Sequence, residues 1–259
     1  MKHRIKVPHI FLAVILGVMY LPILVIVVYS LNGSKISTVW EGISFRWYRE
    51  LFRDRSMREA VRNSLVLAGI SCVNAAVIGT MAAVGMRRIS WKSKGIMAYF
   101  STIPIMIPEI ILGMVFMVFF SFLGLPFGMV TLVLAHTAFC IPYVFTMVRS
   151  RLVGMDRALE EAARDLGAGE GRVFFTVTLP LITPAIVSGM LLAFAMSFDD
   201  VVISIFVTGA TTNTLPVKIY TQMKNGVSPE VNALSVVMLA GTGVVIGVSS
   251  LVRRKRMGE

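Results

Sequence analysis

The sequence predicts an all-α polytopic membrane protein with six transmembrane helices. The chain has 259 residues, of which 56% are hydrophobic and only 15% are charged, whereas a soluble domain is about 25% charged. Its mean hydropathy is +0.79. A water-soluble protein of this size cannot bury so much apolar surface, and a disordered chain would be polar and charged instead. We therefore expect a single transmembrane domain over residues 1–259.

Six apolar stretches are long enough to cross a bilayer, because a helical span needs about 20 residues. Helices are expected because a lone strand would leave its backbone polar groups unpaired in lipid. The stretches are His9–Leu31, Ser64–Met86, Ile96–Leu123, Gly128–Val148, Leu181–Val207 and Val231–Val252.

The first stretch follows three basic residues, Lys2, Arg4 and Lys6, as the apolar region of a signal peptide would. The stretch is too long for that region, and no small-residue cleavage site follows it. We predict an uncleaved first helix.

Basic residues in the connections predict the orientation, because cytoplasmic loops are enriched in Lys and Arg. With the N-terminus inside, sixteen of the 25 basic residues fall in cytoplasmic segments and nine outside. We expect a multi-pass protein of the bacterial cytoplasmic (inner) membrane with both termini in the cytoplasm. Anionic membrane lipid then accounts for the net charge of +11, and no nucleic-acid partner is needed.

The first outer connection contains a segment, 45–53, with apolar and charged residues on opposite helical faces. Tyr48, Leu51 and Phe52 share the apolar face, and Trp47 lies beside them. The pattern predicts a short helix in the outer interface. Such a helix either shields the mouth of the bundle or contacts a ligand.

Acidic residues within the apolar stretches are candidates for a cation pathway, because burying an Asp in a span costs on the order of 2.5–3.5 kcal/mol. Glu109 follows Pro104 and Pro108, which remove backbone donors and predict a break in the third span. Pro108 would be the first residue of the restarted helix, whose positive end favours an ionised Glu109. The alternative is a buried carboxyl bonded to neighbouring helices, with His136 as one partner.

Asp199 and Asp200 lie in the fifth stretch and are adjacent in the chain. On a continuous helix their side chains would point about 100° apart. Both cannot face one narrow pathway equally. We expect at least one to line the pathway while the other pairs with a neighbouring helix or subunit.

The cytoplasmic connection 149–179 predicts a two-helix hairpin. Asp156 can cap the first helix, and glycines 167, 169 and 171 are expected to break it before a second segment, 172–178. Oppositely charged pairs, Arg157–Glu161 and Glu160–Arg164, fall on the exposed side. The helix has an apolar stripe formed by Leu159, Ala162, Ala163 and Leu166. Its small alanines would let another protein surface dock closely.

The hairpin resembles the EAA motif of ABC importer permeases, with Val177 at a position where isoleucine is common. Segments 197–202, 215–220 and 227–233 resemble the PotC-type permease subunit of spermidine/putrescine importers. The motif is carried by Glu161, Ala162, Ala163, Gly167, Leu179 and Pro180.

The resemblance implies a MetI-like permease fold in which the hairpin couples this chain to an ATPase. It implies as partners a homologous second permease subunit, two cytoplasmic ATPase subunits and an extracytoplasmic substrate-binding protein. ATP and Mg would bind to the partner ATPase, and this chain itself would hold no cofactor and no metal. The implied function is import of polyamines (spermidine or putrescine) by alternating access.

The sequence lacks a phosphate-binding G-x-x-x-x-G-K-[ST] loop and an HExxH motif, and its two cysteines are not spaced for zinc. No enzymatic activity is therefore predicted. Two alternatives remain open: the same fold with another cargo, such as an amino acid, or a self-sufficient channel or secondary transporter with the three acids as an ion relay. The hairpin favours the importer, because a channel has no use for an ATPase-docking element.

Overall fold

The computed structural model describes residues 7–34, 39–87, 99, 102–224 and 229–242. Contacts divide the chain into two compact units, one of Met1–Arg58 with Ile219–Glu259 and one of Glu59–Lys218. The described residues are almost entirely helical, and extended backbone pairs among them at one isolated bridge, between Asn32 and Ile43. The all-α class predicted from the sequence is confirmed, while the single domain stays a prediction.

Four of the described helices are long and apolar enough to cross a membrane. They fall on the first, second, fourth and fifth of the six predicted stretches. The third stretch contains a shorter apolar helix, α5 (Glu109–Phe122). The sixth is helical over 229–242, and the rest of it lies outside the described residues. The four long helices are His9–Tyr29, Arg55–Arg87, Met129–Val153 and Glu170–Asp199.

The first unit contains α1 (Val7–Tyr29) and α2 (Arg46–Arg53), which are joined by a hydrogen-bonded loop. The indole Nε1–H of Trp47 donates to the Asn32 carbonyl at 2.7 Å, which ties α2 to the end of α1. The short helix predicted over 45–53 is confirmed, but its buried residues are Trp47 and Leu51, whereas Phe52 is 63% exposed.

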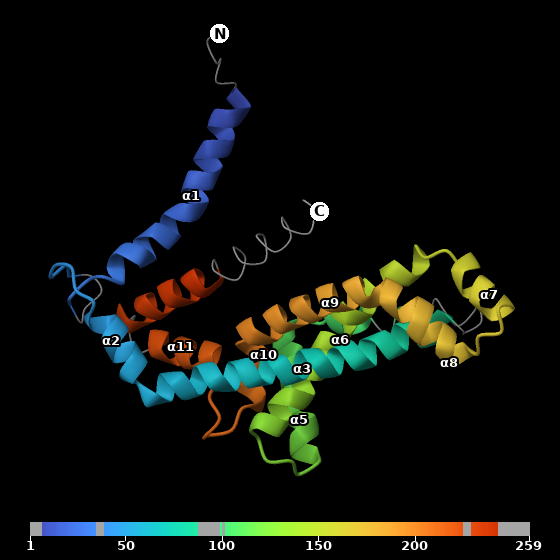
Figure 1. Cartoon of the computed structure of the whole chain (residues 1–259). Coiled ribbons are helices and arrows are strands. Elements are labelled where there is room, and N and C mark those ends of the chain that lie inside the picture. Colours follow the sequence, from blue (N-terminus) through green and yellow to red (C-terminus); the bar gives the residue numbers. More distant parts are fainter. Residues whose placement is uncertain (1–6, 35–38, 88–98, 100–101, 225–228, 243–259) are drawn as a thin grey trace, which may run out of the picture. The chain divides into compact units, whose positions relative to one another are not determined.

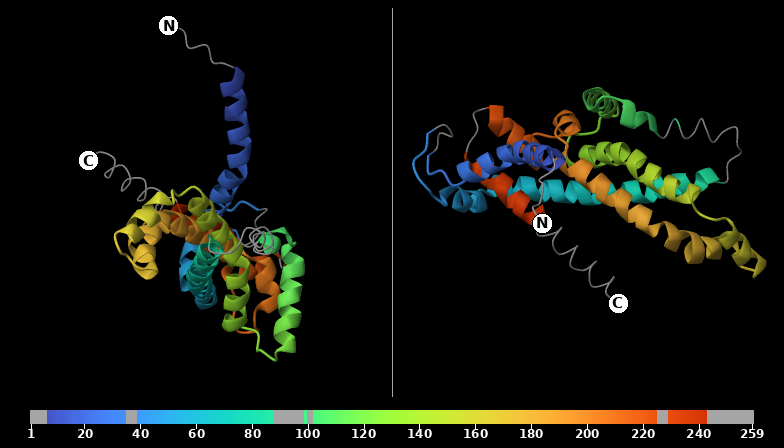
Figure 2. Two further views of the ribbon diagram at one scale, coloured as in Figure 1. Left: turned by 90° about the vertical axis from the view of Figure 1, so that its right-hand side faces the viewer. Right: turned by 90° about the horizontal axis from the view of Figure 1, so that it is seen from above.

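In the second unit α6 (Met129–Val153) is the central helix, and its buried residues extend from Thr131 to Leu152. Figures 1 and 2 show α3 (Arg55–Arg87) and α9 (Leu179–Asp199) running alongside it. The short helix α10 (Val202–Val207) packs against α5 and α6, and α11 (Leu215–Lys224) follows. The core of this unit is therefore built around α6.

Glycines let the neighbouring backbones approach α6 closely. A Cβ atom on Gly79 of α3 would lie 3.0 Å from the Phe145 backbone nitrogen, and one on Gly189 of α9 would lie 3.0 Å from the Val144 Cα. Ala75, Gly79 and Ala83 are spaced four residues apart, and all are buried. This small-residue stripe is the type of surface that membrane helices use for close packing.

The predicted break in the third stretch is confirmed. Residues 102–106 are helical, residues 107 and 108 are not, and α5 restarts at Glu109. Pro108 is the N-cap rather than the first helical residue, since its ψ of 132° is not helical. Its carbonyl accepts the first bond of the new helix from Leu112 at 3.1 Å.

The prediction of one continuous helix over Leu181–Val207 is wrong near its C-terminal end. Asp200 is extended, with ψ 122°, and separates α9 from α10. At the other end, helix α8 (Glu170–Val173) and the π-helical turn η1 (Phe174–Thr178) run directly into α9. Gly171 therefore does not break the helix. In η1 the Leu179 N–H donates to the Phe174 carbonyl five residues back, and the next residue, Pro180, has no N–H to give.

We expect Gly79→Val to lower the thermal stability of the purified protein in detergent, because the added side chain would collide with the α6 backbone. Overpacking of this kind costs about 1–3 kcal/mol. The matched control is Gly85→Val on the same helix, where a Cβ atom meets nothing within 4 Å. Equal melting temperatures for the two variants would contradict the close α3–α6 contact.

Candidate functional site

The break between α9 and α10 is held by the carboxylate of Asp200. Its two oxygens accept the backbone N–H groups of Ile203 at 3.1 Å and Ser204 at 2.8 Å. The residue is only 8% exposed. Asp200 thus caps α10 and satisfies donors that would otherwise be unpaired at the start of a helix.

A fully buried histidine from α6 completes this polar cluster. His136 Nδ1 is hydrogen-bonded to Ser197 Oγ at 2.8 Å, and its Nε2 to Ser204 Oγ at 3.1 Å. Asp200 Oδ2 lies 3.4 Å from the same Nε2. His136 therefore joins α6 to both sides of the break, and its partners are Ser197, Ser204 and Asp200 rather than Glu109, the pairing considered as the alternative for that acid.

The other two acids of the apolar stretches are placed differently. Asp199 is the last residue of α9, and Glu109 is the first residue of α5. Both side chains are exposed in this chain. The structure thus separates the three acids into one structural cap, Asp200, and two exposed carboxylates. The described residues contain no group of three or more His, Cys, Asp or Glu that could hold a metal.

The predicted hairpin begins as the sequence predicts. The Asp156 carboxylate accepts the Ala158 N–H at 3.0 Å, and α7 (Ala158–Asp165) follows. No residue of α7 is buried, and Leu166 just after it is 89% exposed. The predicted coupling residues Glu161 and Ala162 are exposed and Ala163 is half-buried. An unpacked apolar stripe on a helix is a surface that a partner protein can cover.

Gly167 ends α7 in a left-handed conformation, with φ +84°. The Gly167 N–H donates to the Arg164 carbonyl at 2.8 Å, and the Ala168 N–H donates to the Ala163 carbonyl at 3.1 Å. These two bonds form a Schellman motif, which requires a residue that tolerates positive φ. Of the three glycines expected to break the hairpin, Gly167 makes the turn. Leu179, half-buried, and Pro180, exposed, begin α9.

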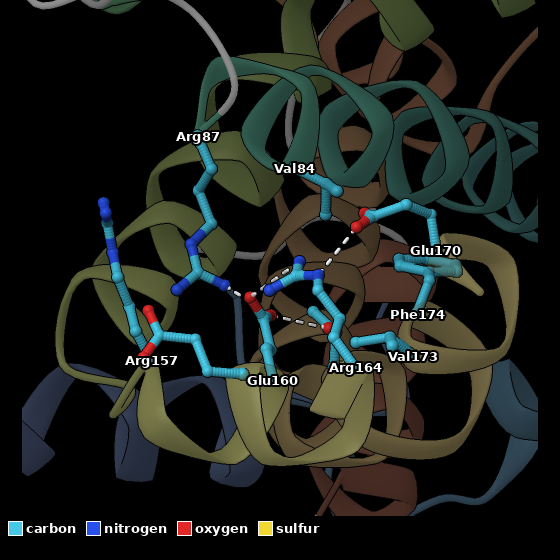
Figure 3. A pocket seen from close by; sticks show the side chains of 10 residues that line it. Val84, Arg87, Arg157, Glu160, Arg164, Glu170, Val173 and Phe174 are labelled. Atoms are coloured by element: carbon cyan, nitrogen blue, oxygen red, sulfur yellow. Dashed lines mark hydrogen bonds and ion pairs between the residues drawn. The ribbon is translucent and has the colours of Figure 1, made fainter. Parts of the chain in front are cut away.

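Glu160 is a site residue that the sequence did not reveal. Its carboxylate oxygen Oε1 lies 2.7 Å from Arg87 Nη1 at the end of α3, and it accepts the Thr178 hydroxyl at 2.7 Å. Its side chain is 13% exposed. Figure 3 shows Glu160 between Arg87 and Arg164 in a cavity of about 200 Å³. The prediction that Glu160 faces solvent is wrong.

One further ion pair of the hairpin, between Arg164 and Glu170, lies at the surface. Arg164 Nε donates to Glu170 at 2.7 Å, and this hydrogen bond raises the pKa of the Arg164 guanidinium. The predicted Glu160–Arg164 pair is present at 3.9 Å. The other predicted pair, Arg157–Glu161, forms no ion pair in the described part of the chain.

These features define a helical membrane protein with an exposed helical hairpin between α6 and α9. Residues 75–256 match the family described as "Binding-protein-dependent transport system inner membrane component". The chain belongs to that family and is a multi-pass transport subunit rather than an enzyme. Because members of this family are components of binding-protein-dependent transport systems, the alternative of a self-sufficient channel is no longer favoured.

Two relatives from Escherichia coli K12 cover most of the chain. The putrescine transport system permease PotI is 45% identical over 88% of this chain and 83% of its own. The spermidine/putrescine transport system permease PotC is 38% identical over 95% of this chain and 93% of its own. The resemblance to permeases of this type, predicted from the sequence, is confirmed.

Solved transporters share the fold at low sequence identity. A subunit of a bacterial ABC transporter involved in alginate import matches with a TM-score of 0.76 and 17% identity, covering 94% of both chains. A chain of the methionine transporter MetNI matches with a TM-score of 0.62 and 19% identity, over 82% of this chain and 98% of its own. The predicted permease fold is therefore confirmed.

We expect Asp200→Ala to destabilise the protein while Asp199→Ala leaves its stability unchanged. Removing a helix-capping side chain costs about 0.5–2 kcal/mol, and Asp199 caps nothing in the described structure. Thermal unfolding in detergent measures the difference between these adjacent positions. A larger loss for Asp199→Ala would contradict the assignment of Asp200 as the cap.

Gly167→Ala should weaken coupling to the ATPase, because a side chain in the left-handed conformation costs roughly 1–2 kcal/mol. Neither Gly167 nor Gly171 has an atom within 4 Å of an added Cβ, and Gly171 lies in a helix. Gly171→Ala is therefore the matched control. The measurement is cargo-stimulated ATP hydrolysis by the assembled transporter, and equal activity of the two variants would refute the role of the turn.

Proposed function

We propose that this chain is the permease subunit of an ATP-driven importer of polyamines, with putrescine as the first candidate cargo. It moves the cargo into the cytoplasm by alternating access. The named activities of the two relatives support a polyamine, and the higher identity to the putrescine permease favours the diamine. Spermidine is the second candidate.

The observation on which the proposal rests is the exposure of two carboxylates at breaks in apolar helices. Glu109 and Asp199 are both exposed where a helix begins or ends. A carboxylate at membrane depth is costly and normally faces a cavity or a partner. A linear dication has two ammonium groups that two such carboxylates can receive, whereas an anionic cargo would be repelled.

The proposed assembly contains a homologous second permease subunit, two cytoplasmic ATPase subunits and an extracytoplasmic substrate-binding protein. ATP and Mg bind to the ATPases, which close on ATP and move the coupling segment through Glu161, Ala162 and Ala163. Both termini and the hairpin lie in the cytoplasm. A single cysteine at the exposed position 166, in a background without Cys72 and Cys140, should react with an impermeant maleimide in inside-out vesicles only.

The decisive experiment is reconstitution of the whole importer in proteoliposomes with ATP inside. Uptake and ATP hydrolysis are measured for putrescine, spermidine and a neutral amino acid in the presence of the binding protein. We expect ATP-dependent uptake of one or both polyamines. Uptake of the amino acid alone would refute the proposed cargo but not the transport class.

Glu109→Gln and Asp199→Asn should lower polyamine uptake while the importer still assembles. Losing one charged contact costs roughly 1–3 kcal/mol, which is about a fivefold to 150-fold weaker interaction with the state concerned. Each amide has nearly the same size as the acid that it replaces, so the substitution removes the charge without changing the packing. Normal uptake by both variants at equal membrane abundance would refute the pathway assignment. Loss of assembly would instead mean that the acids pair between subunits.

A further inference from the structure

The cavity behind α7 brings three segments of the second unit together at one carboxylate. Arg87 is the last residue of α3, Glu160 lies in α7, and Thr178 is the last residue of the π-helical turn at the base of α9. Both 2.7 Å contacts of Glu160 are made through the same oxygen, Oε1. Figure 3 shows the guanidinium of Arg87 directed at Glu160 from α3.

This contact is sheltered from water, unlike the other close ion pair of the hairpin. The side chains of Arg87 and Glu160 are 18% and 13% exposed, and Thr178 is buried. By contrast, Arg164 and Glu170 are 41% and 55% exposed. Exposed pairs contribute little because water screens them, whereas breaking a sheltered pair leaves an uncompensated charge. The Glu160 contact is therefore the stronger constraint on α7.

The rest of α7 is held weakly. None of its residues is buried, and the helix ends in the Gly167 turn. Its exposed stripe has Leu159 at 50% exposure and Leu166 beside it at 89%. A force applied to that stripe therefore reaches α3 through the inward-facing side chain of Glu160, and it reaches the base of α9 both through Glu160 and Thr178 and along the chain through α8 and η1.

We propose that Glu160 is the positioning residue that transmits movement of α7 to α3 and to the base of α9. The inference rests on the proposed importer function, in which an ATPase moves α7. Arg87 carries the movement to α3, and Thr178 carries it to the π turn. Breaking the contact should let the ATPase turn over without moving the spans.

The transport test compares Arg87→Gln, Glu160→Gln and the double variant in the reconstituted importer. We expect each single variant to bind the ATPase normally but to hydrolyse about five- to thirtyfold more ATP per cargo moved, the factor that 1–2 kcal/mol corresponds to. The double variant should be no worse than either single one, because it leaves no unpaired charge. Arg87→Lys, which keeps the charge, should retain most of the coupling.

Thr178 supplies a second matched pair of variants. Thr178→Val keeps the shape and removes the hydroxyl, whereas Thr178→Ser keeps the hydroxyl. We expect only Thr178→Val to raise the ATP used per cargo. Unchanged coupling in all of these variants, while the wild type imports normally, would overturn the role of Glu160 and leave the proposed function standing.

A distance measurement tests the link without any cargo. Spin labels at two exposed positions, Leu166 beside α7 and Met81 on α3, should give one narrow distance distribution in the wild-type protein. Glu160→Gln should broaden it. An unbroadened distribution would overturn the inference even if import itself failed, and reduced ATPase binding by Glu160→Gln would show that the contact only stabilises the hairpin.

Discussion

The need to satisfy every backbone polar group inside a bilayer determines where this protein can depart from a straight helix. Lipid offers no hydrogen bonds, so irregular backbone survives only where protein groups or a water-filled cavity provide them. At the α9–α10 break the Asp200 carboxylate takes two N–H groups. At the far end of α10 the Thr131 hydroxyl donates to the Val207 carbonyl at 2.8 Å. Helix α10 is thus held at both ends, by the Asp200 cap at its start and by Thr131 of α6 at its C-terminal end.

The same constraint explains why adjacent acids have different environments. The Asp200 carboxylate accepts hydrogen bonds from two backbone amides and lies beside the buried His136. Asp199 is one residue earlier, at the C-terminal end of α9, where the helix dipole disfavours negative charge. Glu109 occupies the opposite position, at the N-terminal end of α5, where the dipole favours it. The negative charge of Asp199 is therefore the least stabilised by its own chain. This favours our proposal that a cation from outside the chain binds to it.

Local chemistry could be predicted from the sequence, whereas long-range contacts could not. The break at Pro108 follows from a missing N–H, and the start of α7 follows from Asp156, because both effects act within four residues. The break at Asp200 has no Pro or Gly beside it, and its signal was only an acidic residue ahead of an apolar run. Its partner His136 lies on another helix.

Glu160 illustrates the same limit. From spacing alone, Glu160 and Arg164 form an ordinary i,i+4 pair on a surface helix. The residue instead turns inward because Arg87, 73 positions earlier in the chain, ends α3 within reach. No sequence pattern near Glu160 or near Arg87 predicts this contact. It depends on the packing of α3 and α9 on α6, which the glycines at positions 79 and 189 make possible.

Helix α9 connects the two candidate sites physically. It is continuous from Leu179, next to the π turn that Glu160 holds, to Asp199 beside the polar break. Twenty-one helical residues extend about 30 Å at 1.5 Å each, roughly the thickness of the hydrocarbon core. Because packed helices move as units rather than bending continuously, a shift imposed on Thr178 is delivered to the other end of the same helix. The exposed carboxylate of Asp199 would then change its position when the hairpin moves. Alternating access requires such a change, because the group that binds the cargo must bind it with different affinity in the two states.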